Sequence, residues 1–214
     1  MKDLFYKEFK LWWHPAWFLF LLFGSFLLIP SWPYFIAFWY IFIAFNVVFI
    51  AERSNHDVFF TVSLPVRKRD AVRARVCFVA FIELLQIVVA IPFAVINNAI
   101  YLQGNQAGMN TNFAFFGLIF IMYAVFNLAF LPMFYKTAYK AAPMIWAILS
   151  VIVYAVAVDL AVVLIPVLRT NLDGLGASHL ASQLPVLIAG IVLFALLTLF
   201  AYRVSANRFE KVDL

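Results

Sequence analysis

Long apolar runs alternate with short polar gaps along the whole chain. A helix needs about 20 mostly apolar residues to cross the hydrocarbon core of a bilayer. Helices are favoured because lipid offers no hydrogen bonds, so every backbone N–H and C=O must be paired within the protein. The runs also lack the residue-by-residue alternation of barrel strands. The pattern predicts an all-α integral membrane protein with one transmembrane domain over residues 1–214. Its six expected spans cover residues 15–29, 34–50, 76–96, 113–134, 143–168 and 184–202.

Two parts of this topology have alternatives. The first two spans are short, and Pro30 and Pro33 predict a tight turn between them. One re-entrant hairpin made of both runs is the alternative to two spans. Residues 170–183 follow Pro166 and contain Gly174 and Gly176. This segment is either a broken or re-entrant helix or a plain loop.

The basic residues give the predicted orientation. Fourteen of the 15 Lys and Arg residues lie in the N-terminal segment, the second gap, the fourth gap or the C-terminal tail, and Arg169 is the other. The positive-inside rule places these four segments, and so both termini, in the cytoplasm.

The composition excludes several classes of protein. A chain that is 67% hydrophobic and 12% charged is far more apolar than a soluble domain. The net charge of +5 is better explained by topology and anionic lipid than by nucleic acid, because the basic residues flank apolar spans. Cys77 is the only cysteine, which excludes a disulfide framework within the chain and multi-cysteine metal sites.

Residues 1–14 have the period of an amphipathic helix. Such a helix lies in the membrane interface with its charged face in water. It is either a simple anchor for the first span or a lever that touches a partner. The charged face carries Asp3, Lys7, Lys10 and His14, and the aromatic face carries Phe5, Phe9, Trp12 and Trp13.

Residues 52–75 form the predicted cytoplasmic segment between the second and third spans. An apolar stretch with Phe59 and Phe60 is too short to cross a bilayer. Leu64-Pro65 then predicts a helix start, because proline is preorganised for the first helical turn. Aromatic side chains here need a pocket, in this chain or in another protein. The alternative is a lipid-facing turn with snorkelling arginines.

This segment resembles the cytoplasmic loop of ABC-2-type transporter permeases, in particular the small six-span subunits of bacterial exporters. His56 and Arg67 depart from the family pattern, which usually has an aromatic and Ser or Thr there. The amphipathic N-terminus and the six expected spans extend the resemblance over the chain. The matching positions are Asp57, Leu64, Pro65, Val66, Lys68, Asp70, Val72, Ala74 and Arg75.

The resemblance implies a function and partners. Two permease copies or homologues would pair to form a path across the bacterial plasma membrane. Two separate ATPase subunits would bind ATP and magnesium and would dock on a coupling helix around residues 59–64. The implied coupling residues are Asp57, Phe59, Phe60, Leu64, Pro65, Lys68, Asp70 and Arg75.

The chain lacks the motifs of an enzyme. It has no phosphate-binding loop, so we expect no ATP binding by that route, and no zinc-protease or serine-hydrolase motif. Its three histidines, His14, His56 and His179, are too scattered to predict a metal site. We therefore expect no cofactor in this chain.

Two acids lie inside the spans, and a glutamine accompanies one of them. Glu83 and Gln86 lie three residues apart on one face of the third span, and Asp159 lies towards the outer end of the fifth. A charged group at mid-span costs about 2.5–3.5 kcal/mol on insertion scales, so each acid needs a reason. One reason is a helix–helix hydrogen bond, which a protonated acid can also form, and the other is a pathway-lining or proton-relay group.

The predicted function is that of an exporter permease for an amphipathic or hydrophobic substrate, such as a peptide, an antibiotic or a lipid-like molecule. The alternatives are an ion-coupled secondary transporter or channel that uses Glu83 and Asp159, and a non-transporting membrane scaffold or immunity protein.

Overall fold

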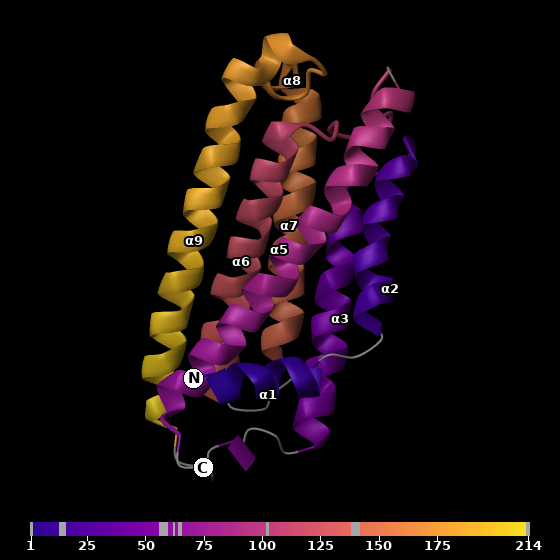
Figure 1. Ribbon diagram of the computed structural model, residues 1–214. Helices are drawn as coiled ribbons and strands as arrows, with labels where there is room; N and C mark the ends of the chain where they lie inside the picture. The colour runs from indigo at the N-terminus through magenta and orange to yellow at the C-terminus, as the bar shows by residue number, and fades with distance from the viewer. Residues whose placement is uncertain are drawn as a thin grey trace.

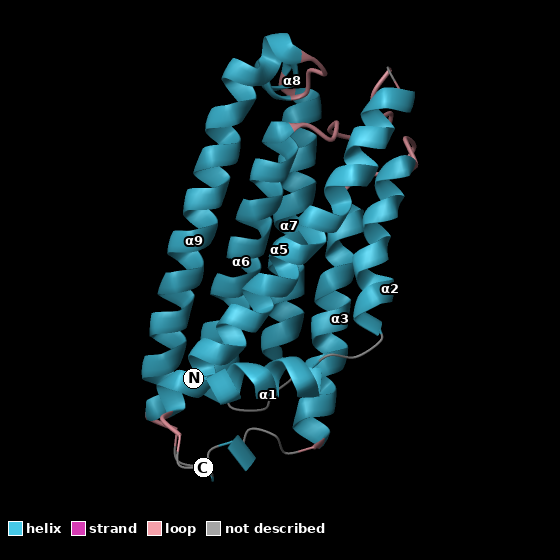
Figure 2. Cartoon of the chain, viewed as in Figure 1, coloured by secondary structure: helices cyan, strands magenta, loops and turns pink. Residues whose placement is uncertain are grey.

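The computed structural model of the chain describes residues 2–12, 16–55, 60–61, 63, 66–101, 103–137 and 142–212. Helices and short connecting loops make up these ranges, and no strand occurs within them (Figure 2). Five helices are long and apolar enough to cross a membrane. The helices are α1 (Lys2–Trp12), α2 (Ala16–Leu22), the 3₁₀ helix η1 (Phe23–Leu28), α3 (Phe35–Ser54), α5 (Lys68–Ile100), α6 (Phe113–Thr137), α7 (Ala142–Leu164), α8 (Pro166–Leu172), the 3₁₀ helix η2 (Ala177–His179) and α9 (Leu180–Glu210).

The long helices run side by side between two ends (Figure 1). α1 lies across one end of the bundle, against α5, and we call this the α1 end. α8 caps the opposite end, which we call the α8 end. α5 crosses the bundle diagonally, from α9 at the α1 end to η1 at the α8 end.

The first predicted span, 15–29, is covered by α2 and η1. Its apolar helical part, Trp17–Leu28, is shorter than the five candidate spans. Gly24 lies against α5, where an added Cβ would come within 3.3 Å of the Ala90 Cα. The six-span count therefore stays a prediction, with five helices that meet the length requirement. The second predicted span, 34–50, lies almost wholly within α3.

α5 and α9 are longer than the predicted spans 76–96 and 184–202. At 1.5 Å per residue, the 33 residues of α5 extend for about 50 Å, whereas the hydrocarbon core is about 30 Å thick. The cationic residues 68–75 form the first two turns of α5, so this helix continues beyond the apolar run. Hydropathy marks the part that fits in lipid and does not mark where a helix ends.

The fifth predicted span, 143–168, differs from the structure at its end. α7 stops at Leu164, Ile165 is extended with ψ 110°, and α8 begins with Pro166. Proline disfavours the helical conformation of the residue before it. The chain therefore has a broken helix at this point, followed by α8 and η2.

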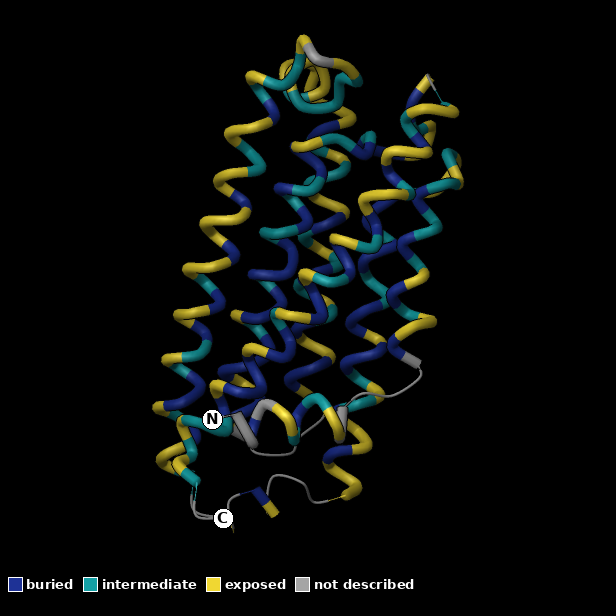
Figure 3. Tube along the Cα trace, in the orientation of Figure 1, coloured by how far each residue is buried: buried dark blue, intermediate teal, exposed yellow. Residues whose placement is uncertain are grey.

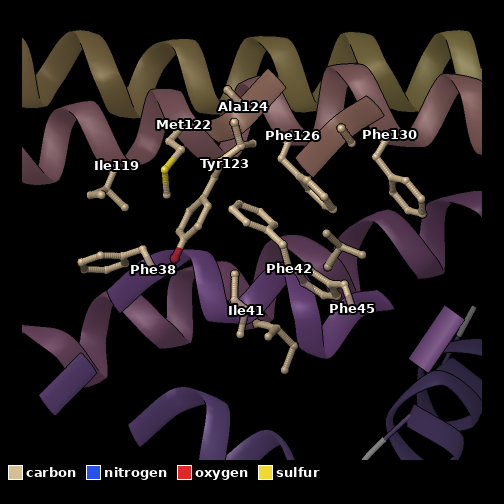
Figure 4. Close-up of a cluster of buried hydrophobic side chains, with 14 of the residues drawn as sticks. Phe38, Ile41, Phe42, Phe45, Ile119, Met122, Tyr123, Ala124, Phe126 and Phe130 are labelled. Atoms are coloured by element: carbon tan, nitrogen blue, oxygen red, sulfur yellow. The ribbon is translucent and has the colours of Figure 1, made fainter. Parts of the chain in front are cut away.

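Aromatic rings fill the space between α3 and α6 (Figure 4). The Phe42 and Phe126 ring centroids are 4.3 Å apart, and Phe45 stacks on Phe126 at 5.8 Å. Tyr123 meets Phe42 at 5.9 Å in an edge-to-face contact. Such pairs add about 0.5–1.5 kcal/mol each beyond the area that they bury. The aromatic residues of α3 and α6 therefore form a structural core.

α6 and α9 pack much more closely than α3 and α6. A Cβ added to Gly190 would lie 2.2 Å from the Gly117 carbonyl oxygen, so only glycine fits at this crossing. Small residues allow such close approach between membrane helices. The outward sides of α7 and α9 are exposed and apolar, as expected for surfaces that face lipid (Figure 3).

Candidate functional site

The predicted coupling segment is described in part. Asp57, Phe59, Leu64 and Pro65 lie outside the described residues. Phe60 is 58% exposed, whereas Thr61 is buried. The exposed Phe60 ring at the α1 end is therefore available to a partner protein.

α1 lies against this segment through Lys7. Its ammonium group donates a hydrogen bond to the Thr61 hydroxyl and lies 5.9 Å from the centre of the Phe60 ring. On the other side of α1, the Phe9 ring packs edge-on against Phe78 and Phe81 of α5, at 5.3 and 5.2 Å. α1 therefore bridges the predicted coupling segment and α5.

The first turn of α5 is tied to the end of α9. The Lys68 ammonium donates a hydrogen bond to the Val212 carbonyl at 2.7 Å and lies over the Phe209 ring. Arg69 forms two hydrogen bonds to the Glu210 carboxylate, at 2.5 and 3.0 Å, on the exposed surface. Asp70 is half-buried in the first turn of α5, where the helix dipole favours an acid.

Arg75 sits at the centre of a buried ion triad. Its guanidinium group donates two hydrogen bonds to Glu8 of α1, at 2.5 and 3.3 Å, and one to Glu52 of α3. All three side chains are less than 10% exposed, and the guanidinium also lies 5.7 Å from the Phe49 ring centre. The triad joins three helices. Arg75 was predicted as a coupling residue, and its burial means that any part it plays in coupling is through these helices.

The partners Glu8 and Glu52 were missed by the sequence reasoning. On a helical projection of α1, Glu8 lies between Leu4 and Trp12, at the edge of the apolar face. An acid on the apolar face of an amphipathic helix needs a cation. The position of Glu8 could therefore have predicted that it pairs with a basic residue. Which cation it meets depends on how α1 lies across α5.

Glu83 is fully buried where α5 meets α6 and α9. The Asn127 amide of α6 donates hydrogen bonds to Glu83 Oε2 at 2.9 Å and to Thr198 Oγ1 of α9 at 3.2 Å. The interpretation of Glu83 as part of a helix–helix hydrogen bond agrees with these contacts. Asn127 and Thr198 were missed, because an isolated amide or hydroxyl in an apolar run has no distinctive spacing.

Gln86 and Asp159 form hydrogen bonds to different parts of the bundle. The Gln86 amide donates to the Ala37 carbonyl of α3 at 3.0 Å and accepts from the Tyr123 hydroxyl of α6 at 2.7 Å. Asp159 accepts a hydrogen bond from the Met109 backbone N–H at 2.9 Å, near the α8 end. The contacts found in the described ranges do not join Glu83 to Asp159.

A polar network closes the α8 end. Asn110 donates to Asp173 from its backbone N–H at 2.7 Å and from its amide to the Asp173 carbonyl at 2.8 Å. Asn112 donates to the Leu172 carbonyl at 2.6 Å. Burial raises the pKa of the Asp173 carboxyl above its usual value, against the lowering effect of the Asn110 hydrogen bond. The amide-rich residues 103–112, between α5 and α6, thus hold the chain just after α8.

A groove of about 890 Å³ opens between α5, α6 and α9 towards the α8 end. This volume is within the range of small-molecule sites. Apolar side chains such as Ile91, Phe116 and Ile191 line most of it, and the amides of Asn98, Asn112 and Gln183 lie at its outer end. None of its lining residues is charged. The groove can accept an elongated apolar group with an uncharged polar end.

Among the residues that the structure describes, no group of three or more His, Cys, Asp or Glu side chains is arranged to hold a metal ion. Cys77 is exposed and has a free thiol. The described geometry therefore holds polar helix contacts, an ion triad and an apolar groove.

Residues 3–210 match a family model described as ABC-2 family transporter protein. Neither the curated proteins nor the solved structures include one with a significant match to the chain. The family match covers nearly the whole chain, including α1, the triad, the groove and α9. The chain therefore belongs to the ABC-2 family of transporter proteins.

Proposed function

We propose that this chain is the permease subunit of an ABC exporter and moves an amphipathic or hydrophobic molecule, such as a peptide, an antibiotic or a lipid-like compound. The family match over residues 3–210 carries this proposal. The family consists of multi-pass membrane components of ABC transporters, which in general are not themselves catalytic and work with ABC ATPases. Two ATPase subunits, a second permease copy or homologue, and a bacterial plasma membrane with both termini in the cytoplasm complete the proposal.

The α1 end is the proposed docking site of the ATPases. Phe60 is exposed there, and an exposed aromatic side chain is a typical anchor in a partner's pocket. The predicted orientation places this end in the cytoplasm, where the ATPase subunits would be.

The contacts around α1 support a route for force from the ATPases to the spans. Movement of the segment at Thr61 would reach α1 through Lys7. From α1 it would reach α5 and α3 through Glu8, Arg75 and Glu52. Such a connection transmits motion because buried, paired charges resist separation.

The groove supports the proposed substrate class. Its apolar walls suit a hydrocarbon or aromatic group, and its outer amides suit hydrogen bonding to an uncharged polar group. An ionic substrate head would find no charged partner among the lining residues.

The test is co-purification of the chain with its ATPase, followed by ATP-dependent transport into inverted membrane vesicles. Phe60→Ala and Pro65→Ala should each lose most of the bound ATPase and of the transport. Phe200→Ala is the matched control, because Phe200 is similarly exposed but lies on a span. Retention of both the ATPase and full transport by the two α1-end variants would reject the docking site.

A further inference from the structure

Glu83 is the most deeply buried acid of the described chain. Its side chain is 0% exposed, and the only hydrogen bond found for its carboxyl group is the one from the Asn127 amide to Oε2. The second N–H of the same amide reaches Thr198 Oγ1. The Asn127 amide of α6 therefore links an acid of α5 to a hydroxyl of α9.

Two oxygen atoms of this cluster lack a partner among the described residues. They are Glu83 Oε1 and Asn127 Oδ1, and both are inaccessible to solvent. An unsatisfied buried polar atom costs about 1–3 kcal/mol, so two in one side-chain pair are unexpected. Because Glu83 and Asn127 are hydrogen-bonded to each other, a single hydrogen atom between the two unpaired oxygens would give both a partner.

No described cation faces Glu83 from the helices packed around it. Along α5, Arg75 is eight residues away, about 12 Å at 1.5 Å per residue, and is engaged by Glu8 and Glu52. On α6 the nearest titratable group is Tyr123, whose hydroxyl donates to Gln86. On α9, Arg203 is exposed, and α3 carries no charged residue from Phe35 to Ala51. An ionised Glu83 would be a buried, unpaired charge, which is strongly unfavourable.

We propose that Glu83 is a proton-binding site and that the neutral acid forms a closed ring with the Asn127 amide. The bound proton lies on Oε1 and is donated to Asn127 Oδ1, while Oε2 accepts from Asn127 Nδ2. A protonated carboxyl group is both a donor and an acceptor, so one proton satisfies both unpaired oxygens and removes the charge. The ring is an uncharged link between α5 and α6, and Thr198 extends it to α9.

The ring lies just beyond the inner end of the groove. Leu84 follows Glu83 on α5, and Phe120 and Ile191 each lie seven residues, or two turns, from Asn127 and Thr198. Loss of the proton would place a negative charge where the three helices meet and would weaken their contact there. The proton therefore controls how firmly the groove is closed at this end. This role does not depend on the proposed transport function.

Infrared spectroscopy of the purified full-length chain in lipid nanodiscs tests the protonation directly. At neutral pH the wild type should show the carbonyl stretch of a protonated carboxylic acid, and Glu83→Gln should remove that component. Glu52→Gln, which alters an ion-paired buried acid, should leave it unchanged. A difference spectrum in which Glu83→Gln removes only carboxylate absorption would overturn the proposal.

Thermal unfolding gives a second, independent readout. Glutamine can form the same ring with Asn127 without a titrating proton. Glu83→Gln should therefore match the wild-type Tm at neutral pH and exceed it at alkaline pH, where the wild type loses its proton. Glu83→Leu, which cannot form the ring, should lower the Tm at neutral pH. A large fall in Tm for Glu83→Gln at neutral pH would show that the negative charge is needed, and the proposal would be wrong.

Discussion

The chain buries glutamate side chains at two sites, and the partners of the carboxyl groups differ between them. At the α1 end, Glu8 and Glu52 share the guanidinium of Arg75. In the middle of the bundle, Glu83 has one amide and no described cation. The first site is an ion pair and the second is, in our proposal, a neutral hydrogen-bonded pair. The charge state of a buried glutamate is therefore decided by which helix brings a partner to it.

The difference between the two sites agrees with their depth along α5. Arg75 lies about two turns into α5, at the end of the cationic residues 68–75 that mark the expected membrane boundary. Glu83 lies two turns further in, where a lone charge has no water and no counter-ion. Charged pairs are thus found where the chain leaves the membrane, and hydrogen-bonded pairs are found within it.

The largest expected effect comes from removing the shared cation. Arg75→Leu removes the cation that Glu8 and Glu52 share, and breaking a buried pair costs about 3–5 kcal/mol. We expect this loss in the free energy of unfolding, measured by reversible unfolding in detergent micelles. Arg73→Leu is the control, because Arg73 is exposed only two residues away, and it should change little. Equal effects of the two variants would show that the triad does not stabilise the fold.

A smaller loss in the free energy of unfolding is expected at the Glu83–Asn127 site. Thr198→Val removes an acceptor of the Asn127 amide and keeps the volume of the side chain. Hydrogen bonds between membrane helices contribute about 0.6 kcal/mol on average, and about 1.7 kcal/mol at most. The same unfolding measurement should give a loss in this range. Thr170→Val, on the exposed part of α8, is the control, and a loss comparable to that of Arg75→Leu would contradict the contrast between the sites.

The smallest effect is expected for an ion pair that remains in water. Glu210→Gln removes the exposed partner of Arg69, and exposed pairs are weakened by solvent and salt. The variant should lower the Tm slightly at low ionic strength and not at high ionic strength. A salt-independent loss would show that Arg69 and Glu210 behave like the buried triad.

The features that could be predicted from the sequence are those that depend on local pattern. Hydropathy located the apolar helices, but the predicted fifth span, 143–168, ran through the break before Pro166. The helix ends were less accurate, because α5 continues through the cationic residues 68–75 into a part of the chain that no longer needs to be apolar. The family resemblance rested on a short motif around Leu64-Pro65, and the match over residues 3–210 confirmed it.

The partners within the bundle could not be predicted in this way. Glu8, Glu52 and Arg75 are separated by 44 and 23 positions in the chain, and only the path of α1 across α5 brings them together. The same holds for Gly117 and Gly190, whose close contact sets the α6–α9 spacing.

The sequence by itself determined the membrane class, the helical composition, the expected orientation and the family, since each follows from composition, spacing or a local motif. Only the tertiary structure decided which polar side chains meet, where a groove remains open and which buried acid has a cation. The physical reason is that burial and pairing depend on contacts between helices. In lipid, a buried polar group must find its partner on a neighbouring helix, and the order of residues along one helix does not reveal that neighbour.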